Sequence, residues 1–87
     1  MPAITLAEAR TFLRVTDDVE DALIQLLIDA AIDRVETAVG LALTDPAPAP
    51  LRLAVLMLVA HGYEHREGEA PVALVEPWLA PYRSARL

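Results

Sequence analysis

The sequence predicts an all-α protein, a small bundle of three main helices followed by a short C-terminal helix and an extended tail. Three observations support this prediction. Apolar residues recur at helical spacing, capping residues stand at segment ends, and prolines separate the segments. Because 87 residues leave room for only one small core, we expect a single helical domain over residues 1–80 and a tail over 81–87.

The first helix is predicted from Leu6 to about Arg14. Thr5 is followed three residues later by Glu8, which is the spacing of a capping box. Leu6, Ala9 and Leu13 then share one side of the helix.

The second helix is predicted from about Asp18 to Val39. Thr16 or Asp17 is expected to cap its start, and Gly40 is expected to end it as a residue in the left-handed conformation. One narrow arc of this helix is polar, and it is formed by Gln25, Asp29, Asp33 and Glu36.

The remaining surface of the second helix has two apolar sides. They are formed by Leu23, Leu26, Leu27 and Ala30, and by Ile24, Ile28, Ile32 and Val35. Both sides could be buried within one bundle. Because so short a chain offers little cover, the sequence favours a subunit interface on the isoleucine side.

The third helix is predicted from Pro50 to about Arg66, after a proline-rich spacer over 45–50. It is apolar nearly all round, so we expect it to be the central rod of the fold. A short helix is predicted around Val72 to Leu79, and an exposed tail is expected after it.

Composition argues against several classes of function. Seven basic residues stand against thirteen acidic ones, a net charge of −6, which disfavours a protein that grips nucleic-acid phosphates. No cysteine is present to form a disulfide or a thiolate metal site. The longest apolar run, Leu53 to Ala60, is far short of the ~20 residues that span a bilayer. We therefore expect a soluble, intracellular protein with no membrane contact.

Candidate catalytic and metal-binding patterns are weak. His61, Glu64 and His65 fit the H-x-x-E-H pattern of inverted zinc peptidases. The downstream acids Glu67, Glu69 and Glu76 offer a third ligand, but no cleft is indicated. Ser84 is the only serine and has no glycine elbow around it. The sequence predicts no catalytic residues, no metal and no cofactor, with a zinc hydrolase as a minor alternative.

The order of motifs along the chain resembles the head-tail connector, or adaptor, family of long-tailed phages, prophages and gene transfer agents. The resemblance lies in ITLAEARTFLRVTDDVEDALIQLLIDAAIDRVETAVG, then PAPLRLAVLMLVAHGYEHRE, then LVEPWLAPYR. The residues that match the family pattern are Thr5, Leu6, Glu8, Ala9, Leu13, Arg14, Asp21, Leu23, Ile24, Leu27, Ile28, Ala31, Glu36, Gly40, Pro50, Leu51, Ala54, Val55, Leu58, Tyr63, Glu64, Arg66, Glu67, Pro81, Tyr82 and Arg83.

This resemblance implies a structural protein and not an enzyme. Such subunits form a ring, commonly of twelve copies, beneath the portal protein. The ring extends the DNA channel and presents a surface to the next tail-completion (stopper) protein. The protein would assemble in the cytoplasm of the bacterial host and remain in the neck of the particle. A small helical dimer with a regulatory role is the alternative.

Two sets of residues then have expected roles, the first inferred from their charge in such a ring and the second implied by the resemblance. Acids on the second helix (Asp29, Asp33 and Glu36), or those at its start, are expected to face the channel and repel passing DNA without binding it. The C-terminal segment is expected to contact the portal through Trp78, Pro81, Tyr82, Arg83 and Arg86. The alternative is that this segment is a frayed terminus without a role.

Overall fold

The computed structural model describes residues 4–40, 42–43, 47–65 and 72–82. Within them the chain forms four α-helices and no strand: α1 (Leu6–Leu13), α2 (Asp21–Val39), α3 (Ala49–Glu64) and α4 (Glu76–Leu79). Two 3₁₀ turns, Val72–Val75 and Ala80–Tyr82, flank α4. The predicted fold class, three main helices and a short C-terminal one, is confirmed.

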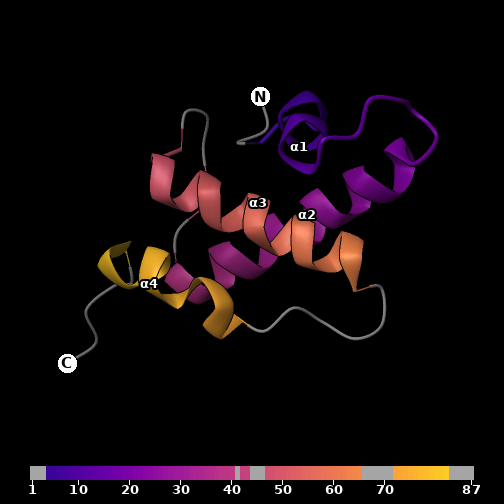
Figure 1. Ribbon diagram of the computed structural model, residues 1–87. Helices are drawn as coiled ribbons and strands as arrows, with labels where there is room; N and C mark the ends of the chain where they lie inside the picture. The colour runs from indigo at the N-terminus through magenta and orange to yellow at the C-terminus, as the bar shows by residue number, and fades with distance from the viewer. Residues whose placement is uncertain (1–3, 41, 44–46, 66–71, 83–87) are drawn as a thin grey trace.

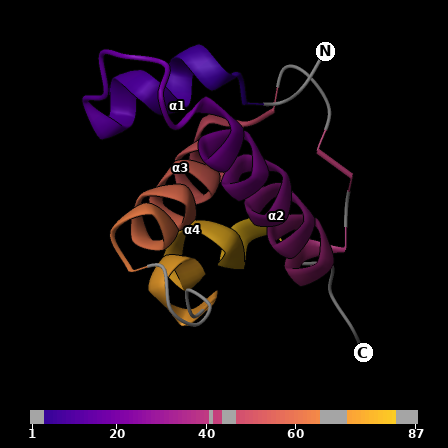
Figure 2. The same ribbon diagram turned by 90° about the vertical axis from the view of Figure 1, so that its right-hand side faces the viewer.

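The bundle is built around the crossing of α2 and α3, which run in roughly opposite directions (Figure 1). Helix α1 lies across one end of this pair and contacts both of its helices. Helix α4 packs mainly against α3, on the other side of the pair from α1 (Figure 2). Helix α3 contacts each of the other three helices, as expected of the predicted central rod, and α2 does so as well.

The start of α1 follows the predicted capping box. The Thr5 hydroxyl accepts a hydrogen bond from the Glu8 backbone N–H at 3.1 Å, and Glu8 Oε1 accepts one from the Thr5 backbone N–H at 2.9 Å. The helix ends at Leu13, where Arg14 adopts the left-handed conformation with φ 62°. An arginine in this conformation is unusual, and the end of the helix agrees with the predicted end at about Arg14.

The second helix begins three residues later than predicted. Asp17 Oδ1 accepts a hydrogen bond from the Val19 backbone N–H at 3.2 Å, so Asp17 stabilises a turn before the helix and does not cap it. Glu20 occupies the N-cap position with no side-chain cap. Gly40 ends the helix at φ 75° as predicted, and its N–H donates to the Glu36 carbonyl.

The third helix packs closely on the second at one glycine. Pro48 precedes α3, and Pro50 lies in its first turn, where a missing N–H costs no helical hydrogen bond. A Cβ on Gly62 would lie 2.9 Å from Leu27 Cδ2 of α2. The absence of a side chain at Gly62 therefore lets the two helices approach each other near the end of α3.

The C-terminal segment belongs to the core. Val75 and Leu79 have no exposed surface, and both lie in the same cluster as the buried residues of α2 and α3. Tyr82 is partly buried against that cluster. The expectation of an exposed tail from Pro81 onward is therefore wrong at Tyr82, because its ring covers apolar side chains of the bundle. Residues 83–87 lie outside the described part of the chain.

One apolar cluster joins all four helices. Its buried members on the main helices are Ala9, Ile24, Ile28, Ala31, Val35, Val39, Leu51, Ala54, Val55, Leu58 and Val59, together with Ile4, Val75 and Leu79. No charged or polar side chain is buried within the described residues.

Candidate functional site

The isoleucine side of α2 faces the interior of the domain. Ile24, Ile28 and Val35 have no exposed surface, and Ile32 is partly buried against the same core. The sequence-based assignment of this side to a subunit interface is therefore wrong. Its premise was that so short a chain lacks cover, but α3 and the segment Val72–Leu79 supply that cover.

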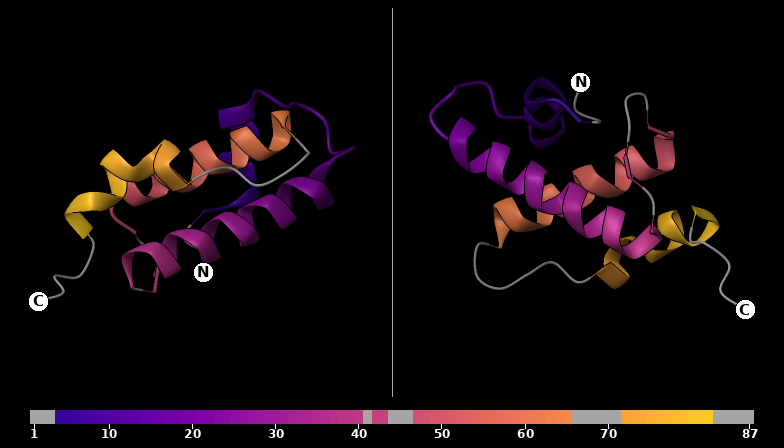
Figure 3. Two further views of the ribbon diagram at one scale, coloured as in Figure 1. Left: turned by 90° about the horizontal axis from the view of Figure 1, so that it is seen from below. Right: turned by 180° about the vertical axis from the view of Figure 1, so that it is seen from behind.

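The opposite side of α2 is the exposed one. Leu26 lies about 180° around the helix from the centre of the buried side, and 64% of its surface is exposed. Ala22 and Ala30, one turn before and one turn after it, are also exposed. We call Ala22, Leu26 and Ala30 the outer α2 row. It lies on the helix that is in front when the molecule is seen from behind (Figure 3, right).

The acids predicted to face a channel have different environments. Asp29 and Asp33 are exposed and lie beside the outer α2 row, and Asp29 accepts a hydrogen bond from the Gln25 amide at 3.1 Å. Glu36 is partly buried, and its Oε2 accepts a hydrogen bond from the Leu43 backbone N–H at 2.7 Å. Glu36 therefore holds the chain that leaves α2, a role that its polar spacing did not indicate.

A second surface feature lies between α1 and α3. It is a hollow of about 420 Å³, open to solvent, lined by Ala7, Glu8, Thr11, Phe12 and Leu56. Phe12 is 41% exposed there. We call these five residues the α1–α3 hollow. Sequence reasoning missed it because helical spacing does not reveal which segments of two distant helices come together.

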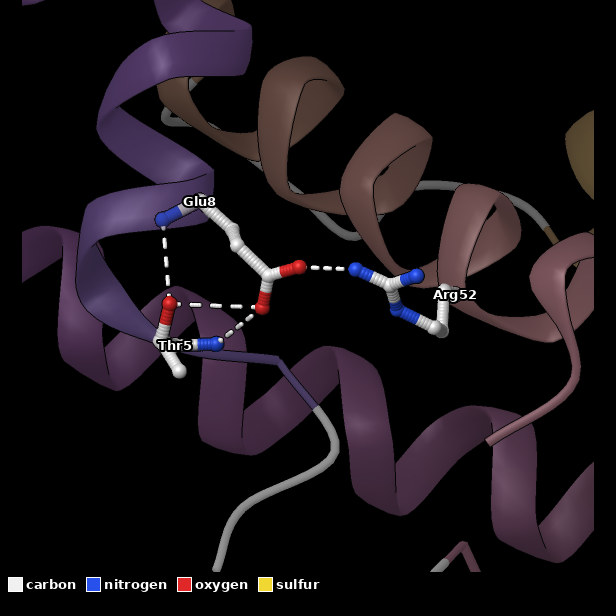
Figure 4. A network of polar contacts seen from close by, with 3 residues as sticks. All are labelled: Thr5, Glu8 and Arg52. Carbon is white, nitrogen blue, oxygen red and sulfur yellow. Dashed lines mark hydrogen bonds and ion pairs between the residues drawn. The ribbon is translucent and has the colours of Figure 1, made fainter. Parts of the chain in front are cut away.

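Glu8 is the one charged residue that lines the hollow, and it interacts with Thr5 at the start of α1 and with Arg52 of α3. Besides its capping hydrogen bonds, its Oε2 forms an ion pair with the Arg52 guanidinium of α3, which joins α1 to α3 (Figure 4). The Thr5 backbone N–H lowers the pKa of the Glu8 carboxyl, and Arg52 lowers it further, whereas burial acts in the opposite direction.

The Glu8 carboxylate makes the free energy of unfolding depend on pH. A carboxyl whose pKa is lower in the folded state than in the unfolded state stabilises the fold when the pH is above its pKa in the unfolded state. That stabilisation is lost as the pH falls through its pKa in the folded state. In Glu8→Gln the amide can still complete the capping box, but the charge is removed. We expect Glu8→Gln to cost less than about 1 kcal/mol at neutral pH, because the pair is partly exposed.

Urea unfolding of both proteins at a series of pH values measures this effect. The difference in unfolding free energy should shrink as the pH falls below about 4, near the ordinary Glu pKa. A difference that stays constant down to about pH 3 would show that the charge of Glu8 contributes nothing.

A second ion pair fixes the junction of α1 and α2. Arg10 Nε lies 3.5 Å from Asp21 Oδ1, and Arg10 Nη2 donates to the Asp17 carbonyl at 2.6 Å. Asp21 and Asp17 therefore serve local structure, and Asp17 and Asp18 still have exposed side chains.

The residues predicted to meet the portal are only partly described. Trp78 is 39% exposed and Pro81 is exposed, whereas Tyr82 packs against the core. Arg83 and Arg86 lie outside the described residues. Of the two aromatic residues described in this segment, Trp78 therefore has the larger exposed fraction.

The two histidines at the end of α3 stack on each other. Their ring centroids are 4.4 Å apart with an interplanar angle of 25°, and His65 Nδ1 lies 3.1 Å from the His61 carbonyl oxygen. Within the described part of the chain, no three His, Cys, Asp or Glu side chains are grouped so that they could hold a metal ion. Glu67 and Glu69 fall outside that part.

None of the described helices is both long enough and apolar enough to cross a bilayer.

Comparison with known proteins agrees with the resemblance seen in the sequence. No curated protein and no solved structure matches the chain. Residues 3–76 match the family model described as phage gp6-like head-tail connector protein, which spans α1, α2, α3 and the turn before α4. The chain therefore belongs to the phage gp6-like head-tail connector protein family.

Proposed function

We propose that the protein is a structural subunit of a head-tail connector, and that its copies form a ring beneath the portal. The ring would extend the DNA channel and join the capsid to the next tail-completion protein. The observation that carries this proposal is the family match over residues 3–76. The distribution of apolar surface supports it, because the molecule presents a protruding helix face and an open hollow of the kind used in protein contacts.

The charge of the surface suits a channel through which DNA slides. Exposed acids repel phosphates, so a duplex can pass without being held. Two exposed sets are available, Asp29 and Asp33 on α2, and Asp17 and Asp18 before it. Glu36 is less suited to this role, because its carboxylate is engaged with the Leu43 N–H.

The C-terminal segment is the part of the chain that we propose to contact the portal. Trp78 and Pro81 offer exposed apolar surface on a short, proline-containing element, and Arg83 and Arg86 follow within a few residues. Trp, Tyr and Arg are the residue types most enriched among interface residues with large binding energies.

Capture by purified portal rings tests this proposal. We expect the full chain to bind portal rings, and electron microscopy to show a collar of connector density beneath them. A chain that ends at Tyr82 keeps every residue of the described core, so its melting temperature should stay unchanged while portal binding falls at least tenfold, a loss of about 1.4 kcal/mol or more.

Point variants separate the contact from folding. Trp78→Ala should weaken portal binding, whereas Leu74→Ala removes a side chain of similar exposure, 41%, from the preceding turn and should leave binding intact. Full binding by both Trp78→Ala and the chain that ends at Tyr82 would move the portal contact to another part of the protein. Failure of the full chain to bind portal rings would contradict the proposed function itself.

A further inference from the structure

We propose that copies of this chain associate head to tail, with the outer α2 row of one copy seated in the α1–α3 hollow of the next. This inference rests on the proposed connector function and names the contact that builds the ring. The partner surface is therefore a second copy of the same chain.

The two surfaces are complementary in shape and polarity. Leu26 protrudes from α2 with 64% of its surface exposed, and the exposed alanines Ala22 and Ala30 on either side let a neighbouring surface approach the helix closely. The hollow is mostly apolar and wide open to solvent, so a leucine side chain of another copy can pack onto it beside Phe12 and Leu56. Burying both surfaces would remove two of the largest exposed apolar side chains from water.

The two surfaces lie on different sides of the molecule. When the molecule is viewed with α1 across the top, α2 and α3 lie on opposite sides (Figure 2), and the outer α2 row lies on the side of α2 away from α3. A contact between two different surfaces of the same protein leaves one of each free at the ends. Repetition of that contact therefore gives a ring when the rotation closes.

Charge favours this pairing over contact between two α2 helices. Asp29 and Asp33 flank the outer α2 row, so packing α2 against itself would bring acids of the two copies together. The hollow contains one acid, Glu8, which is already paired with Arg52, and basic residues lie around it. Arg52 lies one turn before Leu56 on α3 and keeps 40% of its side chain exposed, and exposed Arg14 follows Phe12 by two residues.

In this arrangement Asp29 and Asp33 lie at the edge of the contact between two copies. Asp17 and Asp18, which precede α2, are then the exposed acids of this region left for the channel.

Disulfide trapping tests the contact, because the natural chain has no cysteine. Leu26→Cys and Ala7→Cys are made in separate, differently tagged chains. Both positions are exposed, so neither change removes a core contact, and melting curves verify the fold. The chains are mixed with portal rings, mildly oxidised and separated by gel electrophoresis without reductant.

We expect a disulfide-linked heterodimer in the mixture and no linked product from either chain alone. Leu26→Cys mixed with Ala42→Cys is the control, since Ala42 is exposed but belongs to neither surface. Because a disulfide requires Cα atoms within about 7 Å, Thr11→Cys serves as a second reporter in the hollow.

The outcomes distinguish this inference from the proposed function. A homodimer of Leu26→Cys would overturn the inference, because it would place two α2 helices against each other. Connector rings on the portal without any Leu26–hollow product would overturn it as well, while the connector function stands. Heterodimers without portal binding would support the contact and contradict the connector function. If neither heterodimers nor portal binding are seen, the contact and the connector function are both contradicted.

Discussion

Replacement of Ile28 by aspartate is expected to abolish folding. Ile28 has no exposed surface and lies in the middle of α2 against the central core. Removing a buried isoleucine side chain costs about 2–5 kcal/mol, and a carboxyl group without a partner adds about 1–3 kcal/mol or more. Domains of this size are stable by only about 5–10 kcal/mol, so we expect Ile28→Asp to lose its cooperative melting transition.

The matched control is Leu26→Asp, the same kind of change two residues earlier on the same helix. Leu26 is exposed, so this variant should keep its helical circular dichroism and melt within a few degrees of the natural chain. Loss of ring assembly by a folded Leu26→Asp is the companion expectation. A folded Ile28→Asp that merely fails to assemble would contradict the burial of this side of α2 and restore it as a subunit interface.

The second large effect is expected from Leu79→Ala in α4. Leu79 has no exposed surface, and together with Val75 it completes the core on the α4 side. Truncating a buried leucine to alanine costs about 2–5 kcal/mol, depending on how far the surroundings collapse into the space. For a domain of this length that corresponds to a fall in melting temperature of about 10–20 °C or more.

Leu74→Ala is the control within the same C-terminal segment, because Leu74 is 41% exposed. It should lower the melting temperature much less, since its side chain contributes little buried area. Differential scanning calorimetry measures both variants. Equal, small effects of Leu74→Ala and Leu79→Ala would show that α4 is an appendage of the three-helix core and not part of it.

These expectations separate two roles of apolar residues that are close together in the sequence. Ile28 and Leu79 stabilise the single chain, whereas Leu26 and Trp78 present surface that we propose for assembly. Variants of the first pair test the fold, and variants of the second pair test the connector. A loss of assembly is therefore informative only when the same variant is shown to melt normally.

The sequence by itself determined the helical elements and the family. The capping box of Thr5 and Glu8, the left-handed Gly40 and the proline in the first turn of α3 are local signals, because each acts on backbone groups within a few residues. The order of these elements was enough to indicate the connector family, which the match over 3–76 confirms. Even so, α2 starts at Asp21, later than predicted, because the Asp17 side chain stabilises a turn before the helix and does not cap it.

Only the tertiary structure decided which surfaces are covered. Helical periodicity located two apolar sides on α2 but could not say how far α3 and the C-terminal segment would cover each of them. They bury the isoleucine side and reach Leu27 on the other side, but they leave Leu26 exposed. The α1–α3 hollow and the pair of Glu8 with Arg52 join residues more than forty positions apart. Such contacts depend on how the helices cross. For this reason the interface predicted on Ile24, Ile28, Ile32 and Val35 became the core, and Leu26 on the other side became the exposed surface.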